Sequence, residues 1–427
     1  MDAFLIHGPS RLSGTVRASG AKNAVLPAAA AALLTDEPVA LENVPDVADV
    51  KTMGVLLAGM GADVVRDGTR LTLRADRISS TEAPYDLVRR MRASILVLGP
   101  LLSRFGEARV SLPGGCAIGV RPVDLHLSAL DAMGARIAVE NGYIHAHVSR
   151  VSAAAGRLSG AEITLRQPTV TGTENVLFAA VLARGRTLLR NAAVEPEVVD
   201  VARLLSRMGA RIEGAGTATI RVEGVERLRG TGESPHAIIP DRIETGTYLV
   251  AGAITGGDVT VGSARPGDLT AFLDALRRAG VDVEEAPDSI RAARTGRLRA
   301  TDIRTAPHPG FPTDLQAQFL ALMTQAEGTS RIVETIFENR FLHVAELVRL
   351  GADVKLEGHA AVVRGPSPLE GAPVTASDLR ASAALVLAGL AAAGETRVRR
   401  IYHLDRGYSG MDLRLRSLGA SIDRIPG

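Results

Sequence analysis

Apolar and polar positions recur along the chain with a period of about 71 residues. Six times, an amphipathic helical stretch ends at a glycine, and a short strand of alternating polarity follows. A residue that ends a helix in the left-handed conformation is most often glycine, because it lacks a Cβ. Successive glycines are 73, 75, 71, 71 and 68 residues apart, so six units account for the whole chain. They are Gly61, Gly134, Gly209, Gly280, Gly351 and Gly419.

Each unit also contains a second helical stretch that is apolar nearly all round. A helix without a polar face has to be buried, and small Ala and Gly side chains let such helices pack closely. We therefore predict an α/β fold with helices inside and strands outside. A doubly wound sheet would instead place the apolar runs in the strands. The buried helices are predicted at residues 24–34, 93–102, 175–183, 246–254, 315–323 and 381–393.

Length and composition narrow the class of protein. A chain of 427 residues is too long for one ordinary domain and suggests two or three. Apolar residues at 46% and charged residues at 22% exclude a disordered or collagen-like chain. Aromatic residues at 3% argue against a stacking platform for single-stranded nucleic acid, and a net charge of +2 argues against a general polyanion binder. We expect no nucleic-acid partner.

The cysteine count and the apolar runs indicate a cytoplasmic protein. Cys116 is the only cysteine, so an intrachain disulfide is impossible. The first residues lack the basic region and long apolar core of a signal peptide. The longest apolar stretches fall short of the roughly 20 residues that span a bilayer, so no membrane partner is expected. The sequence has no zinc-ligand spacing and no dinucleotide or ATP loop, which predicts no metal and no cofactor.

Polar and charged residues cluster just before the buried helices. Capping of helix N-termini adequately explains Asp314 and Asp378. It does not explain the cations in these clusters, because positive charge near a helix N-terminus opposes the macrodipole. Several helix N-termini together with such cations indicate a shared anion site. The cations are Lys22, Arg92, Arg242 and Arg380.

Lys22 is also unusual because only three of the 49 basic residues are lysines. A lysine retained in such a chain can mark a place where a compact ammonium is needed and a planar guanidinium is not suitable. Chance retention is the simpler explanation for Lys51 and Lys355.

The segment 111–122 is the most unusual in the chain. Its two prolines and three glycines exclude a helix or regular strand and predict a mobile loop carrying Cys116 and Arg121. A lone cysteine is usually a small buried hydrophobe. In a loop, its thiol has a pKa of about 8.5, which nearby cations lower. Because a bound phosphorylated anion would keep it protonated, the thiol could serve as an acid or as a nucleophile.

These and further motifs, taken together and in order, resemble the UDP-N-acetylglucosamine 1-carboxyvinyltransferase family over essentially the whole chain. The motifs are Gly20-Ala21-Lys22-Asn23, Met91-Arg92-Ala93-Ser94, Pro113-Gly114-Gly115-Cys116, Arg121-Pro122-Val123-Asp124-Leu125-His126, Phe311-Pro312-Thr313-Asp314, Phe337-Glu338-Asn339-Arg340-Phe341, Asp378-Leu379-Arg380-Ala381 and His403-Leu404-Asp405-Arg406-Gly407-Tyr408.

The resemblance implies an EPSP synthase-like fold of two inside-out α/β domains, each of three repeated units. Residues 22–231 would form the first domain, with the Cys116 loop, and residues 1–21 and 232–427 the discontinuous second. The active site would lie in the cleft between them. The implied transferase reaction moves the enolpyruvyl group of phosphoenolpyruvate to the 3′-hydroxyl of UDP-N-acetylglucosamine and releases phosphate. In this family it is the first committed step of peptidoglycan precursor synthesis.

The resemblance also implies roles for individual residues. Cys116 would protonate the methylene carbon, form a covalent phospholactoyl adduct, and react with the phosphoenolpyruvate mimic fosfomycin. Asp314 would take the sugar hydroxyl proton or stabilise positive charge at the ketal carbon, and Lys22 and Arg406 would complete the catalytic set. Phosphoenolpyruvate would contact Lys22, Asn23, Arg92, Arg121, Arg380 and Arg406. UDP-N-acetylglucosamine would contact Asn23, Arg92, Arg121, Pro122, Val123, Asp124, Leu125, Thr169, Val170, Thr171, Asp314 and Ile336.

The sequence departs from the family pattern in the second nucleotide loop. It has Thr169-Val170-Thr171-Gly172 where the family usually has Ser-Val-Gly-Ala, and Gln167 where some members have lysine. This departure predicts a weaker hold on the diphosphate or a changed nucleotide preference.

Three further residues of these motifs have simpler interpretations. His126 either orients side chains or lies on the surface. Arg340 is expected to brace a turn by pairing with Glu338, and Asp405 to hold Arg406.

Three other functions remain open on the sequence alone. A 3-phosphoshikimate 1-carboxyvinyltransferase shares the fold and the phosphoenolpyruvate chemistry, but the Cys116 loop and the run from Arg121 to Leu125 argue against it. A paralogue acting on another uridine nucleotide would change only the region 169–172. A non-catalytic repeat scaffold would need neither Lys22 nor Cys116.

Overall fold

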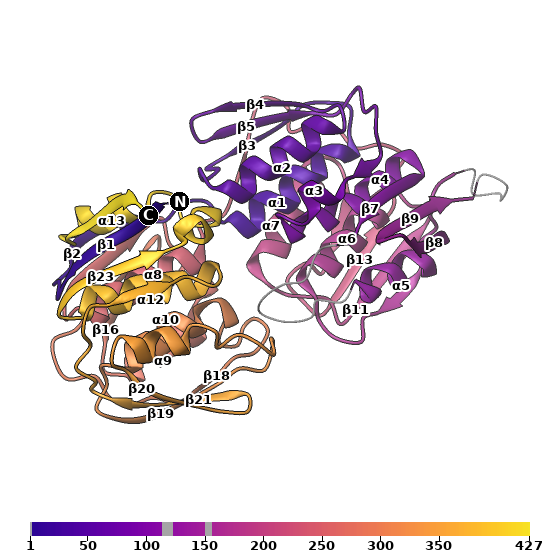
Figure 1. Cartoon of the computed structure of the whole chain (residues 1–427). Coiled ribbons are helices and arrows are strands. Elements are labelled where there is room, and N and C mark those ends of the chain that lie inside the picture. Colours follow the sequence, from indigo (N-terminus) through magenta and orange to yellow (C-terminus); the bar gives the residue numbers. More distant parts are fainter. Residues whose placement is uncertain (1, 113–122, 150–155) are drawn as a thin grey trace. The chain divides into compact units, whose positions relative to one another are not determined.

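The computed structural model describes residues 2–112, 123–149 and 156–427. These residues form two compact units (Figure 1). The first unit spans residues 20–239, and the second comprises residues 2–19 and 240–427. The sequence prediction placed the boundaries between the two units at 21/22 and 231/232. The second boundary lies later, at 239/240, because strand β14 (His236–Ala237) pairs in parallel with β3 (Val39–Glu42) of the first unit.

Six four-stranded sheets, one for each repeat, are divided equally between the units. In every sheet one parallel pair lies at an edge and two antiparallel pairings follow. The first-unit sheets have the orders β14-β3-β5-β4, β6-β7-β9-β8 and β10-β11-β13-β12. Their other strands are β4 (Asp63–Asp67), β5 (Arg70–Arg74), β6 (Glu82–Ala83), β7 (Glu107–Ser111), β8 (Ala135–Glu140), β9 (Tyr143–Val148), β10 (Glu162–Thr164), β11 (Arg186–Arg190), β12 (Arg211–Glu213) and β13 (Thr219–Glu223).

The N-terminal segment completes two sheets of the second unit. The orders are β16-β17-β15-β2, β18-β19-β21-β20 and β22-β23-β1-β24, so β1 occupies the place that β21 has in the preceding repeat. This exchange makes the second unit discontinuous in sequence. Its strands are β1 (Asp2–Gly8), β2 (Ser13–Arg17), β15 (Asp258–Gly262), β16 (Asp282–Ala286), β17 (Ser289–Ala293), β18 (Ile303–Arg304), β19 (Gly328–Val333), β20 (Asp353–Glu357), β21 (Ala360–Gly365), β22 (Pro373–Thr375), β23 (Gly394–Arg399) and β24 (Ile422–Pro426).

The buried helices lie where the apolar runs predicted them. Every residue of α8 from Ile243 to Ile254 is buried, and so is every residue of α12 from Arg380 to Leu390. The sheets cover these helices, so each unit is an inside-out α/β domain, as predicted. The inner helices are α1 (Lys22–Ala31), α4 (Leu98–Phe105), α6 (Val170–Val181), α8 (Arg242–Ile254), α10 (Gln316–Met323) and α12 (Leu379–Ala391).

One inner helix differs from the prediction at its start. Residues before α4 form the 3₁₀ helix η2 (Arg92–Val97) rather than α-helix. Pro100 has no N–H to donate to the carbonyl of Leu96, so an α-helical ladder cannot run through this point unbroken. In α4 itself Pro100 lies in the first turn, where no donor is required.

The half-exposed helices end as the repeat predicted. All six repeat glycines have φ between 86° and 106°, the left-handed region. The outer helices are α2 (Ala48–Gly59), α5 (Asp124–Ala132), α7 (Pro196–Arg207), α9 (Thr270–Arg278), α11 (Val344–Arg349) and α13 (Met411–Ser417). The short helices are α3 (Tyr85–Val88), η1 (Ala32–Leu34), η3 (Pro266–Asp268), η4 (Thr313–Leu315) and η5 (Ile401–Arg406).

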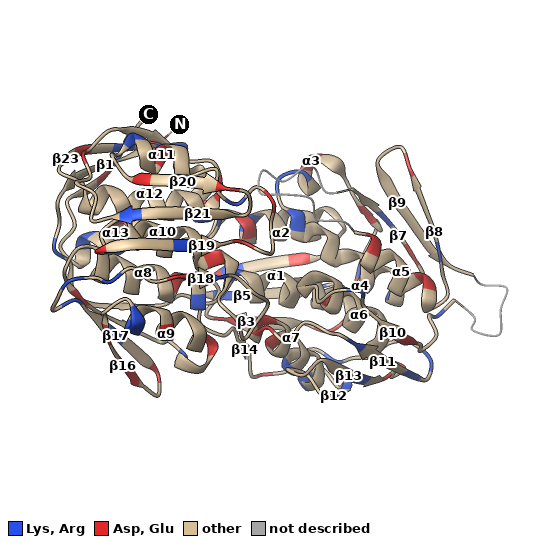
Figure 2. Cartoon of the chain, turned by 90° about the horizontal axis from the view of Figure 1, so that it is seen from below, with Lys and Arg blue, Asp and Glu red and all other residues tan. Residues whose placement is uncertain are grey.

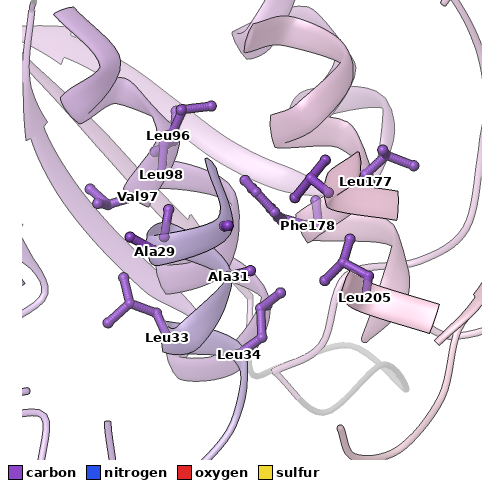
Figure 3. Packing of buried hydrophobic residues seen from close by; sticks show 14 of the residues in the cluster. Ala29, Ala31, Leu33, Leu34, Leu96, Val97, Leu98, Leu177, Phe178 and Leu205 are labelled. Carbon is purple, nitrogen blue, oxygen red and sulfur yellow. The ribbon is translucent and has the colours of Figure 1, made fainter. Parts of the chain in front are cut away.

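Each unit has its own hydrophobic core. Figure 3 shows side chains of α1, η1, η2, α4, α6 and α7 meeting in the first. Close packing there depends on small residues, because a Cβ at Gly99 would lie 2.6 Å from the carbonyl oxygen of Asn175. The ribbon of Figure 2 shows positions of basic and acidic residues dispersed over the strands and outer helices. Within the three described ranges, no helix is long and apolar enough to cross a membrane.

Candidate active site

The predicted site residues are divided between the two units. The first unit carries Lys22, Asn23, Arg92, Val123, Asp124, Leu125, Thr169, Val170 and Thr171. The second carries Asp314, Ile336, Arg380 and Arg406. The remaining predicted residues, Cys116, Arg121 and Pro122, lie outside the described residues.

Lys22 is the first residue of α1, and Asn23 follows it. Its ammonium nitrogen lies 3.0 Å from Oδ2 of Asp49, in the first turn of the neighbouring helix α2. Both side chains are largely buried, at 12% and 5% exposure. Asp49 therefore supplies negative charge where Lys22 opposes the helix dipole. By contrast, the pair between Lys51 and Asp46 is exposed, as expected of an ordinary surface lysine.

The start of α6 explains half of the departure in the second nucleotide loop. Thr169 caps the helix, with Oγ1 accepting the N–H of Gly172 at 3.3 Å. A Cβ at Gly172 would lie only 2.3 Å from the methyl carbon of Thr169. The extra methyl group of threonine at position 169 occupies the space that the Cβ of alanine at position 172 would need. Glycine at position 172 therefore makes room for threonine in place of serine at position 169. The new feature is the Thr171 hydroxyl, at a place where the family pattern has glycine.

Thr171 is the outer member of a buried polar chain. Its Oγ1 lies 3.4 Å from Nε2 of His126, and Nδ1 of His126 lies 2.9 Å from Nδ2 of Asn175. The Asn175 amide orientation is set because its Oδ1 accepts the N–H of Gly99 and its Nδ2 also donates to Ile95. Nδ1 of His126 must therefore accept, which leaves Nε2 as the protonated nitrogen.

His126 is thus a buried orienting residue and not a surface histidine. Burial lowers its pKa to about 4, so it is neutral at pH 7. Through Asn175 it links α5, α6 and the η2–α4 segment, and these elements also carry the predicted nucleotide contacts.

The start of α5 presents the other first-unit nucleotide residues. Asp124, the first residue of α5, forms an exposed ion pair with Arg166. Leu125 is buried in the core, so its backbone rather than its side chain would be available to a ligand. Val123 precedes the helix, and Arg92 begins η2.

In the second unit, Asp314 does not cap a helix. Its Oδ1 accepts from Nη2 of Arg340 at 2.8 Å, and its Oδ2 accepts from Nε and Nη2 of Arg380 at 3.1 and 3.0 Å. Capping was therefore the wrong interpretation for Asp314. It is correct for Asp378, whose Oδ1 accepts the N–H groups of Arg380 and Ala381 at the start of α12.

Arg340 also differs from its prediction. Its guanidinium reaches Asp314, 26 residues away in sequence, rather than Glu338, which is exposed. It lies over the ring of Phe337, with 5.4 Å between the guanidinium carbon and the ring centroid. A residue expected to brace a local turn is therefore part of the candidate site.

The two guanidinium groups are buried, at 3% and 4% exposure, whereas the Asp314 side chain is 26% exposed. Burial alone would lower the pKa of Arg380, but the charge of Asp314 and the nearby Tyr408 more than offset it, so that pKa lies above its ordinary value. Arg380 therefore remains charged where it pairs with Asp314.

Arg380 also contacts a buried polar cluster of Tyr408, Thr247 and Gln318. Its guanidinium carbon is 5.5 Å from the ring centroid of Tyr408. The Tyr408 hydroxyl is 2.9 Å from Oγ1 of Thr247, and Nε2 of Gln318 donates to both oxygens. These residues come from α8 and α10 and from the segment after η5, and the sequence patterns did not single out Thr247 or Gln318.

The 3₁₀ helix η5 carries Arg406 as its last residue. Asp405, expected to hold Arg406, forms hydrogen bonds of 2.5 and 3.3 Å with Arg424 of β24. Burial, together with the positive charges of Arg400 and Arg406, lowers the pKa of His403 in the same helix. Two cations, Arg400 and Arg406, therefore lie close to His403.

Across the described ranges, no cluster of three or more His, Cys, Asp or Glu side chains is arranged to bind a metal ion.

Two inside-out α/β units with repeated sheets define a known class of proteins. A family model described as EPSP synthase (3-phosphoshikimate 1-carboxyvinyltransferase) matches residues 6–413, and the chain belongs to that family. Within it, the chain is 56% identical to the UDP-N-acetylglucosamine 1-carboxyvinyltransferase of Anaeromyxobacter sp. (strain K) and 55% identical to that of Solibacter usitatus. Each alignment covers all of both chains.

Solved structures show the same fold. The enolpyruvyl transferase NikO from Streptomyces tendae superposes with a TM-score of 0.87 at 30% identity, covering 100% of this chain and 99% of that one. An EPSP synthase from Acinetobacter baumannii superposes over the full length of both chains with a TM-score of 0.75, but at only 16% identity, which supports the fold alone.

Proposed function

We propose that this enzyme transfers the enolpyruvyl group of phosphoenolpyruvate to the 3′-hydroxyl of UDP-N-acetylglucosamine and releases phosphate. The observation that carries the proposal is the identity of 55–56%, over the full chain, to curated proteins named for that reaction. The second-unit cluster around Asp314 supports it, because it offers an anionic base held between cations.

Phosphoenolpyruvate carries a phosphate and a carboxylate, so it needs several cations. Arg380 and Arg406 suit the planar carboxylate, which a guanidinium can bind through two parallel hydrogen bonds, and Lys22 suits the phosphate as a compact point charge. Each charge-assisted hydrogen bond contributes about 1.5–3 kcal/mol. Arg92 and Arg121 are proposed to add further contacts.

The reaction then proceeds by an addition and an elimination, and each of these two steps needs two proton transfers. In the addition, Cys116 donates a proton to the methylene carbon, while the sugar oxygen bonds to the central carbon and passes its proton to Asp314. In the elimination, a base takes one proton from the new methyl group, the carbon–oxygen bond to phosphate breaks as the departing oxygen gains a proton, and the enol ether forms. General acid–base assistance of this kind contributes roughly 10²–10⁴-fold.

The ion pairs of Asp314 bear on its role as a base. Two guanidinium groups hold its carboxylate in a defined orientation. An anionic substrate that draws Arg380 away would leave Oδ2 available to the hydroxyl of the acceptor sugar. Binding of phosphoenolpyruvate would thus prepare the base for the acceptor sugar.

The nucleotide is proposed to bind at the starts of α5 and α6. Helix N-termini present unpaired N–H groups to anions, which suits a diphosphate. The Thr171 hydroxyl, accepting from the protonated Nε2 of His126, can direct its own proton to a phosphate oxygen. Asn23 and Ile336 would hold the sugar.

Two rivals have a specific basis. A 3-phosphoshikimate acceptor is raised by the family name, and another uridine nucleotide is raised by Thr171 in the second nucleotide loop. A phosphate-release assay with phosphoenolpyruvate and each of UDP-N-acetylglucosamine, UMP and shikimate 3-phosphate separates them. We expect release with UDP-N-acetylglucosamine, and at most slow release with the other two. Preferential turnover of either alternative would contradict the proposal.

We further propose that this reaction opens peptidoglycan precursor synthesis in the cytoplasm. The support is the resemblance of the motifs around Lys22, Cys116 and Arg406 to the family that performs this step.

A further inference from the structure

Glu334 is a buried carboxylate that the roles proposed above do not use. It follows β19 directly and is 1% exposed. Its Oε1 accepts from Oγ1 of Thr305 at 2.9 Å and from the backbone N–H groups of Ile336 and Phe337 at 2.7 and 3.2 Å. Its Oε2 accepts from Oγ1 of Thr313 at 2.8 Å. One carboxylate therefore holds three chain segments together.

The first segment carries the proposed base. Thr313 immediately precedes Asp314 in η4, and this short helix has no side-chain cap of its own. The hydrogen bond from Thr313 to Glu334 is therefore a direct side-chain restraint on the start of the turn that presents Asp314.

The second segment leads to one cationic partner of that base. Glu334 holds the backbone at Ile336 and Phe337, and the Phe337 ring lies against the guanidinium of Arg340. Arg340 in turn binds Asp314. Glu334 thus restrains both ends of the Asp314–Arg340 ion pair, and it also restrains the proposed sugar contact at Ile336.

The third segment, at Thr305, is a buried support for the other two. Thr305 is fully buried at the end of β18. Its Oγ1 accepts the N–H of Thr335 at 2.9 Å, and its carbonyl accepts the Thr335 hydroxyl at 2.6 Å. Two hydrogen bonds therefore join Thr305 to Thr335. Glu334 connects this pair to Thr313 and to the backbone at Ile336 and Phe337.

The hydrogen-bond donors of the cluster suit a side chain with two acceptor oxygens. Four donors converge on Glu334, and a carboxylate accepts at both oxygens without donating. A glutamine could keep the three hydrogen bonds at Oε1 only by turning its NH₂ group toward Thr313, whose hydroxyl would then accept instead of donating. A side chain selected only for packing would not need this arrangement.

We propose that Glu334 is a positioning residue that sets the place of Asp314 relative to Arg340 and to the backbone at Ile336. The proposal rests on the function proposed above for Asp314. A displacement of about 1 Å at a reacting group can lower the rate roughly 10²-fold, so loosening this restraint affects catalysis more than folding.

The test compares Thr313→Val with Thr313→Ser. Valine has a similar shape but no hydroxyl, whereas serine keeps the hydroxyl. Thr396→Val is the matched control, because Thr396 is buried in the same unit and its hydroxyl has no hydrogen-bond partner among the described residues. Glu334→Ala removes all four of these hydrogen bonds and is the stronger variant, and the Thr313 pair decides the question if Glu334→Ala does not fold.

We expect Thr313→Val to lower kcat roughly tenfold to 10²-fold while KM for phosphoenolpyruvate changes less than threefold and the thermal midpoint stays close to wild type. Thr313→Ser and Thr396→Val should remain within about threefold of wild type. Wild-type kcat in Thr313→Val, equal losses in the serine and valine variants, or a loss of kcat that merely follows a loss of stability would each overturn the proposal.

A second measurement does not depend on turnover. Amide hydrogen exchange over residues 311–316 should be faster in Thr313→Val than in Thr313→Ser or wild type. Equal exchange in all three would overturn the restraint itself. If the wild-type protein did not convert phosphoenolpyruvate and UDP-N-acetylglucosamine but the exchange difference appeared, the proposed function would be wrong. The restraint of the Asp314 turn by Glu334 would still be supported.

Discussion

Two inner helices, α1 in the first unit and α12 in the second, begin with a cation that opposes the helix dipole. At α1, Lys22 meets one carboxylate oxygen of Asp49. At α12, Arg380 uses two nitrogens on Asp314, which also binds Arg340, while Asp378 caps the helix. The first arrangement places a compact point charge against Asp49. The second is an oriented network around a carboxylate that remains partly exposed.

The difference indicates separate tasks for equivalent places in the repeat. A single ammonium can exchange its partner for a phosphate without a fixed geometry. A carboxylate fixed by two planar guanidinium groups has a defined orientation, as proton transfer requires. We therefore assign anchoring mainly to the α1 site and proton chemistry mainly to the Asp314 site.

The largest effect is expected from Asp314→Asn. Asparagine keeps the size and some hydrogen bonding but cannot accept a proton, so kcat should fall by roughly 10²–10⁴-fold while the protein remains folded. Steady-state kinetics and thermal unfolding measure the two effects. A variant that unfolds, or one that retains its kcat, would remove the distinction between the two helix starts.

The two units should also share a dependence of stability on pH. Burial lowers the pKa of His126 in the first unit and of His343 in the second to about 4. Because an unfolded histidine titrates near pH 6.5, the unfolded state binds more protons between pH 6.5 and 4, so stability falls as pH falls through this window. Each histidine contributes a loss of up to about 3 kcal/mol at pH 4.

Urea unfolding at pH 7, 5.5 and 4 tests this dependence. In His126→Gln the free energy of unfolding should vary less steeply with pH than in wild type, whatever its value at pH 7. An unchanged slope would show that His126 is not a buried neutral group.

Alkylation by fosfomycin tests the anchoring role of Lys22. Intact mass should show one adduct on wild type and none on Cys116→Ala. Loss of one charge-assisted hydrogen bond in Lys22→Ala should slow alkylation roughly tenfold or more. Asp49→Asn provides the comparison, because it leaves the ammonium in place and should slow the reaction less. Equal rates in Lys22→Ala and wild type would argue against an anion site at α1.

The smallest effect is expected at the cap of α12. Asp378→Ala removes the acceptor for two backbone N–H groups and should lower stability by about 1 kcal/mol. Denaturant unfolding measures this loss. A much larger loss of kcat than of stability would show that Asp378 belongs with Asp314 rather than with the helix scaffold.

Local patterns in the sequence predicted most of the fold. The repeat glycines, the apolar inner helices and the cap at Asp378 depend on residues within a few positions of one another. Backbone conformation, helix burial and capping are set at that range, so pattern and residue type suffice to infer them.

Only the tertiary structure determined the partners of the charged groups. Asp314 pairs with residues 26 and 66 positions away, and His126 meets Asn175 across 49 positions. Strands β1 and β2 likewise pair with strands that are far away in the sequence, β23, β24 and β15. Hydrogen bonds and ion pairs act over a few ångströms in space, and no local pattern records which distant segments the packing of helices and sheets brings within that range.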